Sequence, residues 1–326
     1  MTTCSIIIPV HNRAALTRQC LDGLLGCPSE VASLEIVVVD DASSDSTAQV
    51  LADYADRVRV VHHEHNMGFA MACNDGAAAA SGDWIVFLNN DTIPQPGWLD
   101  ALLCYASGHD RIGLVGSKLL FPNDTIQHAG VVFARDRSPH HIYAGFPAGH
   151  PAVNKSREFQ VVTGACALIR RELFEEAGRF DAAFVNGYED VDLCLRLRRL
   201  GYEVHYCHKS VLYHLESATR NYLTDPQNFA LFLERWEDFV QPDDVEYYLA
   251  DGLMDITYWE QFPALLWVSP ALAVLGRERA NATERLLAQR SRQIFEALKE
   301  NRQLRIELLE AEERASRLNG ASIRSA

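Results

Sequence analysis

The stretch DWIVFLNNDTIPQPGWL, residues 83–99, joins an apolar run to a polar cluster and a proline-bearing turn. Its part WIVFLNND, residues 84–91, begins as a short, continuous apolar run, which is typical of a strand buried on both faces. The run ends in Asn89, Asn90 and Asp91. We therefore expect a sheet edge that presents two amides and a carboxylate together.

Three similar runs precede this one: CSIIIPV at 4–10, LEIVVVDD at 34–41 and VRVVHH at 58–63. Segments with helical spacing or helix-capping residues lie between them, at 13–25 and 44–55. Strands that alternate with helices in this way predict an α/β fold with a Rossmann-like, mostly parallel, doubly wound sheet.

Polar clusters follow all four predicted strands, at 9–12, 40–41, 66–68 and 89–91. Ligands of doubly wound sheets bind beyond the carboxyl ends of the strands. A lone polar residue at such a place is more often a turn or helix cap than a ligand contact. Four clusters at one edge favour a site of nucleotide size.

The phosphate-binding signatures GxGxxG and GxxxxGK[ST] do not follow the first strand, which disfavours a dinucleotide or P-loop enzyme. A bound diphosphate would then need a divalent cation for charge neutralisation. Hard cations such as Mg²⁺ prefer oxygen ligands, and Asp91 supplies a carboxylate at the predicted edge.

Composition narrows the class of protein. The chain has 326 residues, 48% of them hydrophobic, which suits one or two globular domains. A net charge of −14 argues against a nucleic-acid partner, because such proteins normally carry a basic face. The eight cysteines form no CxxC pair. The segment MTTCSIIIPVHNR has no basic n-region and only a short apolar run, so we expect no export. The apolar stretch 262–276 is shorter than the roughly 20 residues of a spanning helix, so we expect a soluble, cytoplasmic protein.

Several motifs occur in a familiar order: SIIIPVHNR, EIVVVDDASSDST, the segment HNMGFAMACNDGAAAASGDWIVFLNNDT, TGACALIRRELFEEAGRFDAAF and GYEDVDLCLRLRRLGYEVHY. Together they resemble the family-2 glycosyltransferases with a GT-A fold, notably the bacterial rhamnosyltransferase-like branch, over about residues 3–240. This resemblance implies a nucleotide-diphosphate sugar donor, a divalent cation (Mg²⁺ or Mn²⁺) and inversion at the anomeric carbon.

The resemblance also assigns the donor side of the site. It places the first two strand ends near the nucleotide base and ribose, and the next segment beneath the donor. The triplet 89–91 takes the place of the family's DxD motif, whose last acid bridges cation and diphosphate. Because Asn89 replaces the first acid, Asp91 carries most of the metal prediction. The predicted donor-binding residues are Pro9, His11, Asn12, Asp40, Asp41, Asn66, Gly68, Asn74, Asn89, Asn90 and Asp91.

Three carboxylates, Glu189, Asp190 and Asp192, begin a predicted helix whose apolar face is formed by leucines 193, 197 and 200 and which Gly201 ends. Capping alone needs fewer acids. In the family, the second acid of this ED pair deprotonates the acceptor hydroxyl, which implies that Asp190 is the base. Glu189, the first acid of the pair, is predicted to be catalytic with it.

Two further assignments follow from the resemblance and position. His214, at the end of the strand-like run 202–214, is implied to complete the metal site with Asp91. Thr163 and Gly164 are predicted to face the acceptor, although a purely structural turn is an equal alternative. The polar stretch 135–158 suits a loop that orders over donor or acceptor.

The predicted domains are a catalytic domain at 1–240 and a helical extension at 241–326. Residues 283–318 are dense in helix formers and predict a docked helix or a homo-oligomer contact; an extended coiled coil is the less favoured alternative. The stretch 262–276 suits packing on the catalytic domain or peripheral membrane contact.

Three classes of function remain open from the sequence. The leading one is a non-processive glycosyltransferase that uses dTDP-rhamnose or a UDP-sugar and a glycan or lipid-linked acceptor. A polysaccharide synthase would carry QxxRW, but FLERW at 232–236 has Phe232 in place of the glutamine. An inactive nucleotide-sugar-binding scaffold is disfavoured, because Asp91, Asp190 and His214 are all present.

Overall fold

The computed structural model describes residues 2–215, 226–257 and 265–272. The chain divides into two compact units, Met1–Asp251 and Gly252–Ala326. The first half of the first unit contains β1 (Thr2–Val10), α1 (Ala14–Leu25), β2 (Ala32–Asp40), α2 (Thr47–Ala52), β3 (Arg59–His62), α3 (Gly68–Ala79), β4 (Trp84–Leu88), β5 (Thr92–Pro94), α4 (Trp98–Ser107) and β6 (Ile112–Leu120).

The second half of this unit adds short strands and the helices that complete it. They are β7 (Ile126–His128), β8 (Val131–Phe133), β9 (Pro139–His141), the 3-10 helix η1 (Pro151–Val153), β10 (Arg157–Phe159), β11 (Cys166–Arg170), α5 (Arg171–Glu176), α6 (Glu189–Arg199), β12 (Glu203–His214), α7 (Pro226–Trp236) and α8 (Asp244–Ala250). In the second unit, β13 (Met254–Thr257) pairs antiparallel with β14 (Leu265–Val268).

A ten-stranded sheet with the main order β10-β12-β6-β11-β4-β1-β2-β3 runs through the first unit. The pairs β1–β2, β1–β4, β2–β3 and β6–β12 are parallel, whereas β11 runs antiparallel to both β4 and β6. Val10 is paired with Asp40, and Asp40 with His62, so the first three strands end at one level. The predicted mostly parallel α/β sheet is confirmed.

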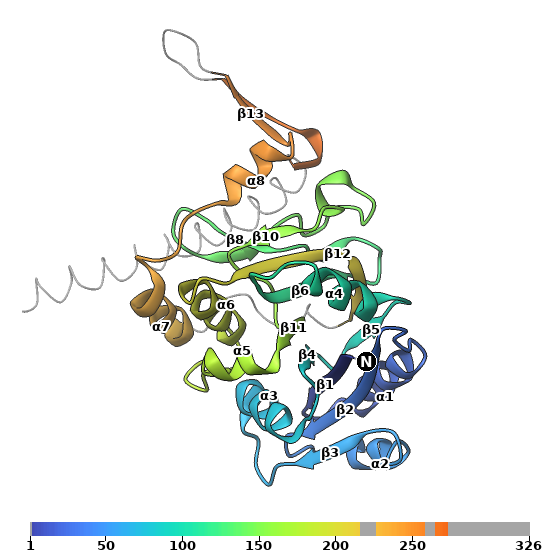
Figure 1. Cartoon of the computed structure of the whole chain (residues 1–326). Helices are drawn as coiled ribbons and strands as arrows, with labels where there is room; N and C mark the ends of the chain where they lie inside the picture. Colours follow the sequence, from blue (N-terminus) through green and yellow to red (C-terminus); the bar gives the residue numbers. More distant parts are fainter. Residues whose placement is uncertain (1, 216–225, 258–264, 273–326) are drawn as a thin grey trace, which may run out of the picture. The chain divides into compact units, whose positions relative to one another are not determined.

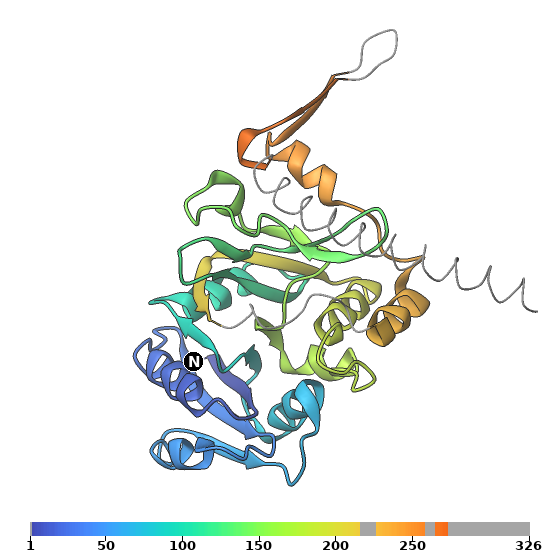
Figure 2. The same cartoon turned by 180° about the vertical axis from the view of Figure 1, so that it is seen from behind.

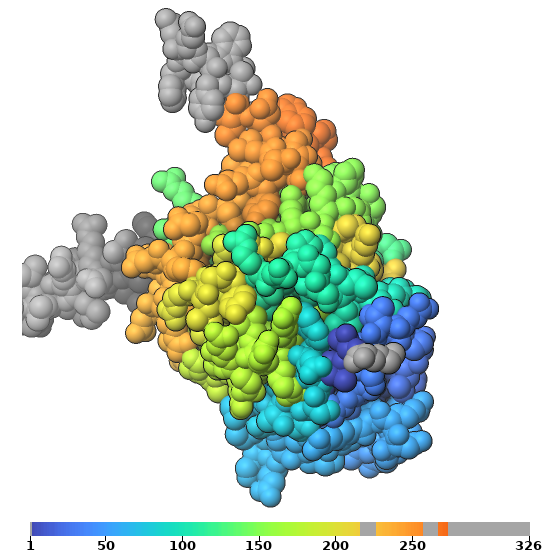
Figure 3. All heavy atoms as spheres, viewed as in Figure 1, coloured from blue at the N-terminus to red at the C-terminus, as the bar shows by residue number. Residues whose placement is uncertain are grey.

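Helices cover both faces of this sheet, as the two opposite views show (Figures 1 and 2). One face packs Ile8, Val38 and Val86 against α1, α2 and α4. On the other face lie α3, α5 and α6, which adjoin one another in the space-filling view (Figure 3). Helix α3 packs very closely, because a Cβ at Gly76 would clash with the side chain of Ile7. The edge at the carboxyl ends of β1, β2 and β4 therefore belongs to a sheet that is packed on both faces.

Several predicted boundaries move. Strand β4 ends at Leu88, so Asn89, Asn90 and Asp91 follow the strand and do not belong to it. The helix predicted at 44–55 is shortened to α2, Thr47–Ala52. On α6, Leu193 and Leu197 are fully buried, but Leu200 is 48% exposed, because the helix has ended there and Gly201 follows with a φ of 92°.

The stretch predicted as a loop at 135–158 contains regular structure. Its residues Pro139–His141 form β9, which pairs antiparallel with the buried strand β8. The stretch also contains η1, and β10 begins at Arg157. The buried apolar residues of β8 provide a strand edge, and the backbone of β9 satisfies its hydrogen bonds.

The first unit extends beyond residue 240. Asp243 accepts hydrogen bonds from the Phe133 N–H at 2.8 Å and from Gln160 Nε2 at 2.7 Å. Asp251 accepts from Arg157 Nη2 at 2.7 Å. These contacts attach residues 241–251 to β8, to β10 and to Gln160, which follows β10.

The functional division into domains 1–240 and 241–326 stays a prediction, and the helix predicted at 283–318 lies outside the described residues. Of the stretch 262–276, residues 265–268 form β14, whose partner is β13. Within the described ranges, no helix has the length and apolar character needed to cross a membrane.

Candidate active site

The loops after β1 and β2 hold each other at the sheet edge. Asn12 has a left-handed φ of 60°, and its Oδ1 accepts the Ser44 N–H at 2.8 Å. The ring nitrogen Nδ1 of His11 lies 2.7 Å from the carbonyl oxygen of Asp41. Pro9, one residue before the end of β1, is only partly buried. The structure thus brings the predicted residues Pro9, His11 and Asn12 to the end of β1.

The carboxylate of Asp41 is buried and ties β2 to α3. It accepts hydrogen bonds from the Met67 N–H at 2.7 Å, from the Gly68 N–H at 2.9 Å and from His63 Nδ1 at 2.8 Å. Asp40 accepts the Ser43 N–H at 3.0 Å. These bonds fix the first turn of α3, where Gly68 adopts a left-handed φ of 82°. The predicted contact of Asp40, Asp41 and Gly68 with a nucleotide-sugar donor stays a prediction.

Asn66 and Asn74 differ in what they offer a ligand. Asn66 is exposed, and its Oδ1 accepts the Gly68 N–H at 3.1 Å. Asn74 is buried, and its amide makes two hydrogen bonds to the backbone of Phe180, at 2.9 and 3.0 Å. The second residue therefore joins α3 to the segment after α5, which gives it a structural role in addition to its predicted one.

Asp91 and His214 meet at the end of β4. Strand β5 pairs with β12 so that Thr92 lies opposite His214, and this pairing places Asp91 Oδ1 2.9 Å from His214 Nε2. Asn89 Nδ2 lies 3.4 Å from the same ring nitrogen. Asn90 points elsewhere and donates to Thr17 Oγ1 at 2.9 Å. The two predicted metal ligands, 123 positions apart in the chain (214 − 91), are therefore adjacent.

This pair fits a divalent cation. Asp91 Oδ1 is buried and has no hydrogen-bond partner among the described residues, although an imidazole nitrogen lies beside it. A carboxylate oxygen and an imidazole nitrogen are both common metal ligands in proteins. The described part of the chain contains no group of three or more His, Cys, Asp or Glu side chains placed to hold a metal. Further ligands would have to come from a bound donor.

The three acids at the start of α6 have three different environments. Asp190 accepts the Gly164 N–H and the Val191 N–H, each at 2.8 Å. Glu189 is buried and accepts the Gly187 N–H at 2.5 Å.

Asp192 is also buried, and it accepts from Arg196 Nε at 2.7 Å and from Trp236 Nε1 at 2.9 Å. Asp192 therefore fastens α6 to α7, and the Arg-Trp pair of FLERW, at 235–236, takes part in this packing.

One short segment, residues 163–165, connects the predicted donor-binding residue Asn89 with the predicted base Asp190. The Asn89 N–H donates to the carbonyl oxygen of Ala165 at 2.9 Å, and the Gly164 N–H donates to Asp190. A Cβ at Gly164 would lie 3.1 Å from the Cβ of Asp190, which is a tight contact. Thr163 Oγ1 accepts the Ala165 N–H at 3.3 Å. The predicted acceptor residues thus form the turn that holds Asp190.

The loop before α6 is strained and clamped. Asn186 and Tyr188 have left-handed φ values of 53° and 71°, a conformation that Asn tolerates but that is costly for Tyr. Asn228 on α7 accepts the Val185 N–H at 3.2 Å and donates to the carbonyl oxygens of Val185 and Gly187 at 2.8 and 3.1 Å. Such strain is held where a site needs it. Here the left-handed residues and the Asn228 hydrogen bonds together fix the backbone that leads into α6.

Sequence reasoning missed several residues around the site. Burial, with the nearby Asp136 and Asp190 carboxylates, raises the pKa of Tyr188 to about 12. Burial, with the charges of His141 and His214, lowers the pKa of His128 well below its usual range. Gln127 contacts His214 directly. A single Gln, His or Tyr carries no spacing signal, so only the tertiary packing identifies these side chains.

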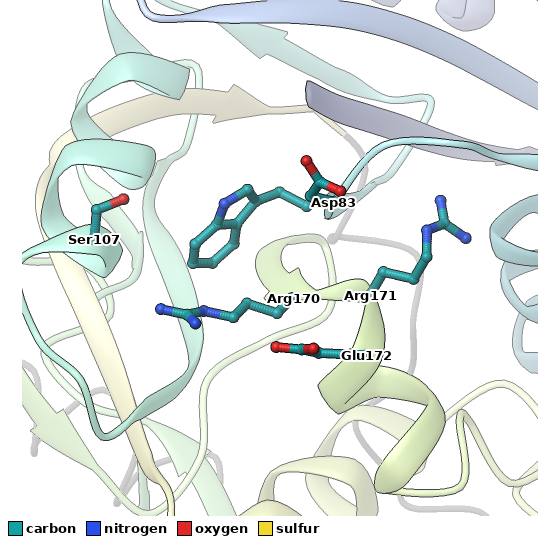
Figure 4. A pocket seen from close by; sticks show the side chains of 6 residues that line it. Asp83, Ser107, Arg170, Arg171 and Glu172 are labelled. Carbon is teal, nitrogen blue, oxygen red and sulfur yellow. The ribbon is translucent and has the colours of Figure 1, made fainter. Parts of the chain in front are cut away.

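An open surface pocket of about 490 Å³ lies elsewhere (Figure 4). Its lining includes Asp83, Trp84 and Arg170, at the beginning of β4 and the end of β11. Arg170 lies over the Trp84 ring, 5.1 Å from its centroid. Because Asn89 and Asp91 follow the other end of β4, this pocket is not part of the candidate site.

Comparison with solved structures supports the fold. A crystal structure of GalNAc-T7 with UDP, GalNAc and Mn²⁺ matches 66% of this chain and 44% of that chain, with a TM-score of 0.56 and 18% sequence identity. Staphylococcus aureus TarS in complex with UDP-GlcNAc matches 66% of this chain and 59% of that chain, with a TM-score of 0.50 and 17% identity. Both show the GT-A arrangement of the sheet.

Other relatives are closer in sequence. The chain is 34% identical over 253 residues to the O-antigen biosynthesis protein RfbC of Myxococcus xanthus, which covers 75% of this chain and 20% of that protein. It is 30% identical over 210 residues to the pre-mycofactocin glycosyltransferase of Mycobacterium tuberculosis, which covers 62% of this chain and 40% of that protein. The chain therefore spans less than half the length of these two relatives.

A third relative is the N-acetylglucosaminyl-diphospho-decaprenol L-rhamnosyltransferase of M. tuberculosis, 27% identical over 209 residues, with 57% of this chain and 68% of that protein covered. The sequence model described as "Glycosyl transferase family 2" matches residues 5–178, more than half of the chain. This match includes Asp91 and Gly164 and ends before Asp190 and His214. On this match, and with the GT-A fold, the chain belongs to glycosyl transferase family 2.

Proposed function

We propose that this chain transfers a sugar from a nucleotide-diphosphate donor to a hydroxyl of a glycan or lipid-linked acceptor, with inversion at the anomeric carbon. The donor is dTDP-rhamnose or a UDP-sugar. Relatives named for O-antigen biosynthesis and for L-rhamnose transfer support a role in cell-surface polysaccharide synthesis, and solved neighbours with UDP or UDP-GlcNAc support the donor class.

On the donor side, Asp91 and His214 would hold Mg²⁺ or Mn²⁺ with phosphate oxygens of the donor. Asp91 Oδ1, which is buried and has no hydrogen-bond partner among the described residues, and the adjacent imidazole nitrogen support this assignment, as does the Mn²⁺ of the GalNAc-T7 structure. When bound, such a cation stabilises the negative charge of the departing diphosphate. The loops after β1 and β2, with His11, Asn12 and Asp41, would bind the nucleoside.

On the acceptor side, Asp190 takes the proton of the attacking hydroxyl. Its two oxygens are oriented by the Gly164 and Val191 N–H groups, so the carboxylate has a fixed direction before the acceptor binds. A positioned base of this kind contributes roughly 10²- to 10⁴-fold to rate. A single displacement inverts the anomeric centre and needs no carboxylate nucleophile, in contrast to retaining glycosidases.

The observation that carries the proposal is the shared turn at residues 163–165. It bonds to Asn89 at the donor edge and to Asp190 at the start of α6, so one rigid segment fixes the metal-ligand end of β4 relative to the base. A reaction between a donor at one side and an acceptor at the other requires this kind of fixed relation.

The test is hydrolysis of dTDP-rhamnose and of UDP-glucose, UDP-galactose and UDP-GlcNAc, with Mn²⁺, with Mg²⁺ and with EDTA. We expect one donor to be cleaved only when a divalent cation is present. The Asp91→Ala variant should lose this activity, and Asp192→Asn, which changes a carboxylate used for packing, should keep it. Cleavage of no donor by the folded wild type, or cleavage unaffected by EDTA, argues against the proposal.

Three accompanying expectations also stay predictions: the cytoplasmic location, peripheral contact with the inner face of the membrane, and self-association through residues 283–318. The described residues do not bear on any of them.

A further inference from the structure

We infer that Gln127 is a positioning residue for the cation: its side-chain amide fixes His214 in the tautomer whose Nε2 lone pair faces Asp91. This inference rests on the proposed function, because it concerns the metal site of that function. Gln127 itself does not touch the predicted metal position. It acts through the imidazole.

The contact between Gln127 and His214 is double. Gln127 is the middle residue of β7 and is only 4% exposed. Its Oε1 lies 2.5 Å from His214 Nδ1, and its Nε2 donates to the backbone carbonyl oxygen of His214 at 3.2 Å. The second bond settles which end of the amide is which, since the reversed amide would place oxygen against oxygen.

The tautomer follows from this orientation. An amide oxygen only accepts hydrogen bonds, so the facing Nδ1 must carry the hydrogen. A neutral imidazole has one N–H group, and Nε2 is then left with its lone pair. A second contact agrees, because Asn89 Nδ2, which only donates, lies 3.4 Å from that Nε2. Two amides on opposite sides of the ring therefore favour the same tautomer.

The consequence falls on Asp91. With the lone pair on Nε2, no proton lies between this nitrogen and Asp91 Oδ1, although the atoms are 2.9 Å apart. Asp91 Oδ1 is buried and lacks a hydrogen-bond partner among the described residues. Two electron-rich atoms placed together in this way provide two ligands for a cation. In the other tautomer, the Nε2–H would donate to Asp91 and close the site without a metal.

Hydrogen bonding of the second ring nitrogen is a general way in which proteins orient a metal-binding histidine, and loss of such a partner typically weakens metal affinity about 10- to 100-fold. A purely structural role would not require an amide here. Backbone pairing already fixes His214 on β12, and on β7 it fixes Ile126 and His128, the two neighbours of Gln127. Leucine has a similar size and would fill the same buried space.

The first experiment reads the tautomer directly. Long-range ¹H–¹⁵N spectra of the histidine side chains are recorded at pH 8 in EDTA, and the His214 signals are assigned by their loss in His214→Gln. We expect the wild type to show the Nδ1–H form. Gln127→Leu, which removes both bonds, should shift His214 toward the Nε2–H form. A wild type in the Nε2–H form, or a Gln127→Leu variant that keeps Nδ1–H, overturns the inference.

The second experiment measures Mn²⁺ binding by electron paramagnetic resonance, with UDP or dTDP present. We expect Gln127→Leu to bind Mn²⁺ about 10- to 100-fold more weakly. Gln127→Glu keeps an acceptor for the Nδ1–H but turns its second oxygen toward the His214 carbonyl oxygen, so it should recover only part of the affinity. Gln160→Leu is the matched control, since Gln160 also bonds a backbone carbonyl and a side chain, at Gln241 and Asp243. Its Mn²⁺ affinity should equal that of the wild type.

The outcomes separate the two hypotheses. Normal Mn²⁺ binding by Gln127→Leu, in a wild type that does bind Mn²⁺, overturns the role of Gln127 and leaves the proposed function intact. Absence of Mn²⁺ binding by the wild type with both nucleotides overturns both.

Discussion

Replacement of Asp190 by asparagine tests the proposed base most directly. Asparagine keeps the size of the side chain but cannot take the acceptor proton. Loss of a positioned general base lowers turnover roughly 10²- to 10⁴-fold. In terms of the barrier, this corresponds to about 3 to 5 kcal/mol.

The structure also sets the expected cost in stability. Asp190 accepts two backbone N–H groups, from Gly164 and Val191, one on each oxygen. Asparagine has one oxygen, so one N–H would face the amide NH₂ and lose its partner. An unpaired buried donor costs about 1 to 3 kcal/mol. The variant should therefore unfold at a lower urea concentration and yet remain folded under assay conditions.

Two assays separate these effects. Transfer or hydrolysis is measured with the donor that the wild type cleaves, and affinity for that donor with Mn²⁺ is measured by calorimetry. Turnover should fall, whereas donor affinity should stay nearly unchanged. Asp192→Asn serves as the control, because it removes a carboxylate from the same helix that bonds Arg196 and Trp236. It should lose stability and keep its turnover per folded molecule.

Turnover at the wild-type rate in Asp190→Asn would refute the assignment of the base. A variant that fails chiefly because it no longer binds the donor would refute it equally, because Asp190 would then belong to the donor side.

Three further predictions follow. Asp91→Ala should keep the fold and lose cation-dependent nucleotide binding in calorimetry, because its Oδ1 contributes charge to the site and makes no hydrogen bond within the described part of the chain; unchanged affinity with Mn²⁺ would contradict this. Deletion of residues 283–326 should change oligomeric state or membrane recovery more than it lowers the rate of donor hydrolysis. An equally large effect on hydrolysis would show that the tail completes the site. Burial, with His141 and His214 nearby, holds the pKa of His128 well below 6.5. The folded protein therefore keeps this histidine neutral, and the resulting contribution to the free energy of unfolding is complete above pH 6.5 and is lost as the pH falls below it. Between pH 7.5 and 5.5 the wild type should lose about 1 kcal/mol more of its free energy of unfolding than His128→Gln, measured with urea; equal losses would contradict it.

The sequence predicted the sheet and the positions of the polar residues at its strand ends well, for a physical reason. Strands buried on both faces must be apolar throughout, so β1, β2 and β4 are visible as Ile- and Val-rich runs. The polar residues that follow them are then conspicuous by contrast. Asp91 and His214 could be paired only through the family resemblance, because 122 residues separate them and the contact is made by β5–β12 pairing.

The other parts of the site depend on tertiary contacts that leave no pattern. Asp192 is as acidic as Asp190 in sequence, and only the position of Trp236 shows that it is used for packing. Gln127 lies in a three-residue strand that is too short to recognise. Strand β9 lies in a polar stretch, and it is regular because it pairs with β8, not because of its own composition.

The reversed direction of β11 has a consequence for how such proteins diversify. Strand β6 runs parallel to β4 and ends at Leu120, whereas β11 runs the opposite way and begins at Cys166. Residues 121–165 therefore begin and end at the same edge of the sheet, the one that holds Asp91, and their strands β7 and β10 pair only with β6 and β12 in that sheet. A segment with both ends at one edge can be lengthened, shortened or exchanged without moving β1–β4. Chimaeras made at these two points would exchange the acceptor-side turn, together with Gln127, and leave the nucleoside-binding loops after β1 and β2 in place.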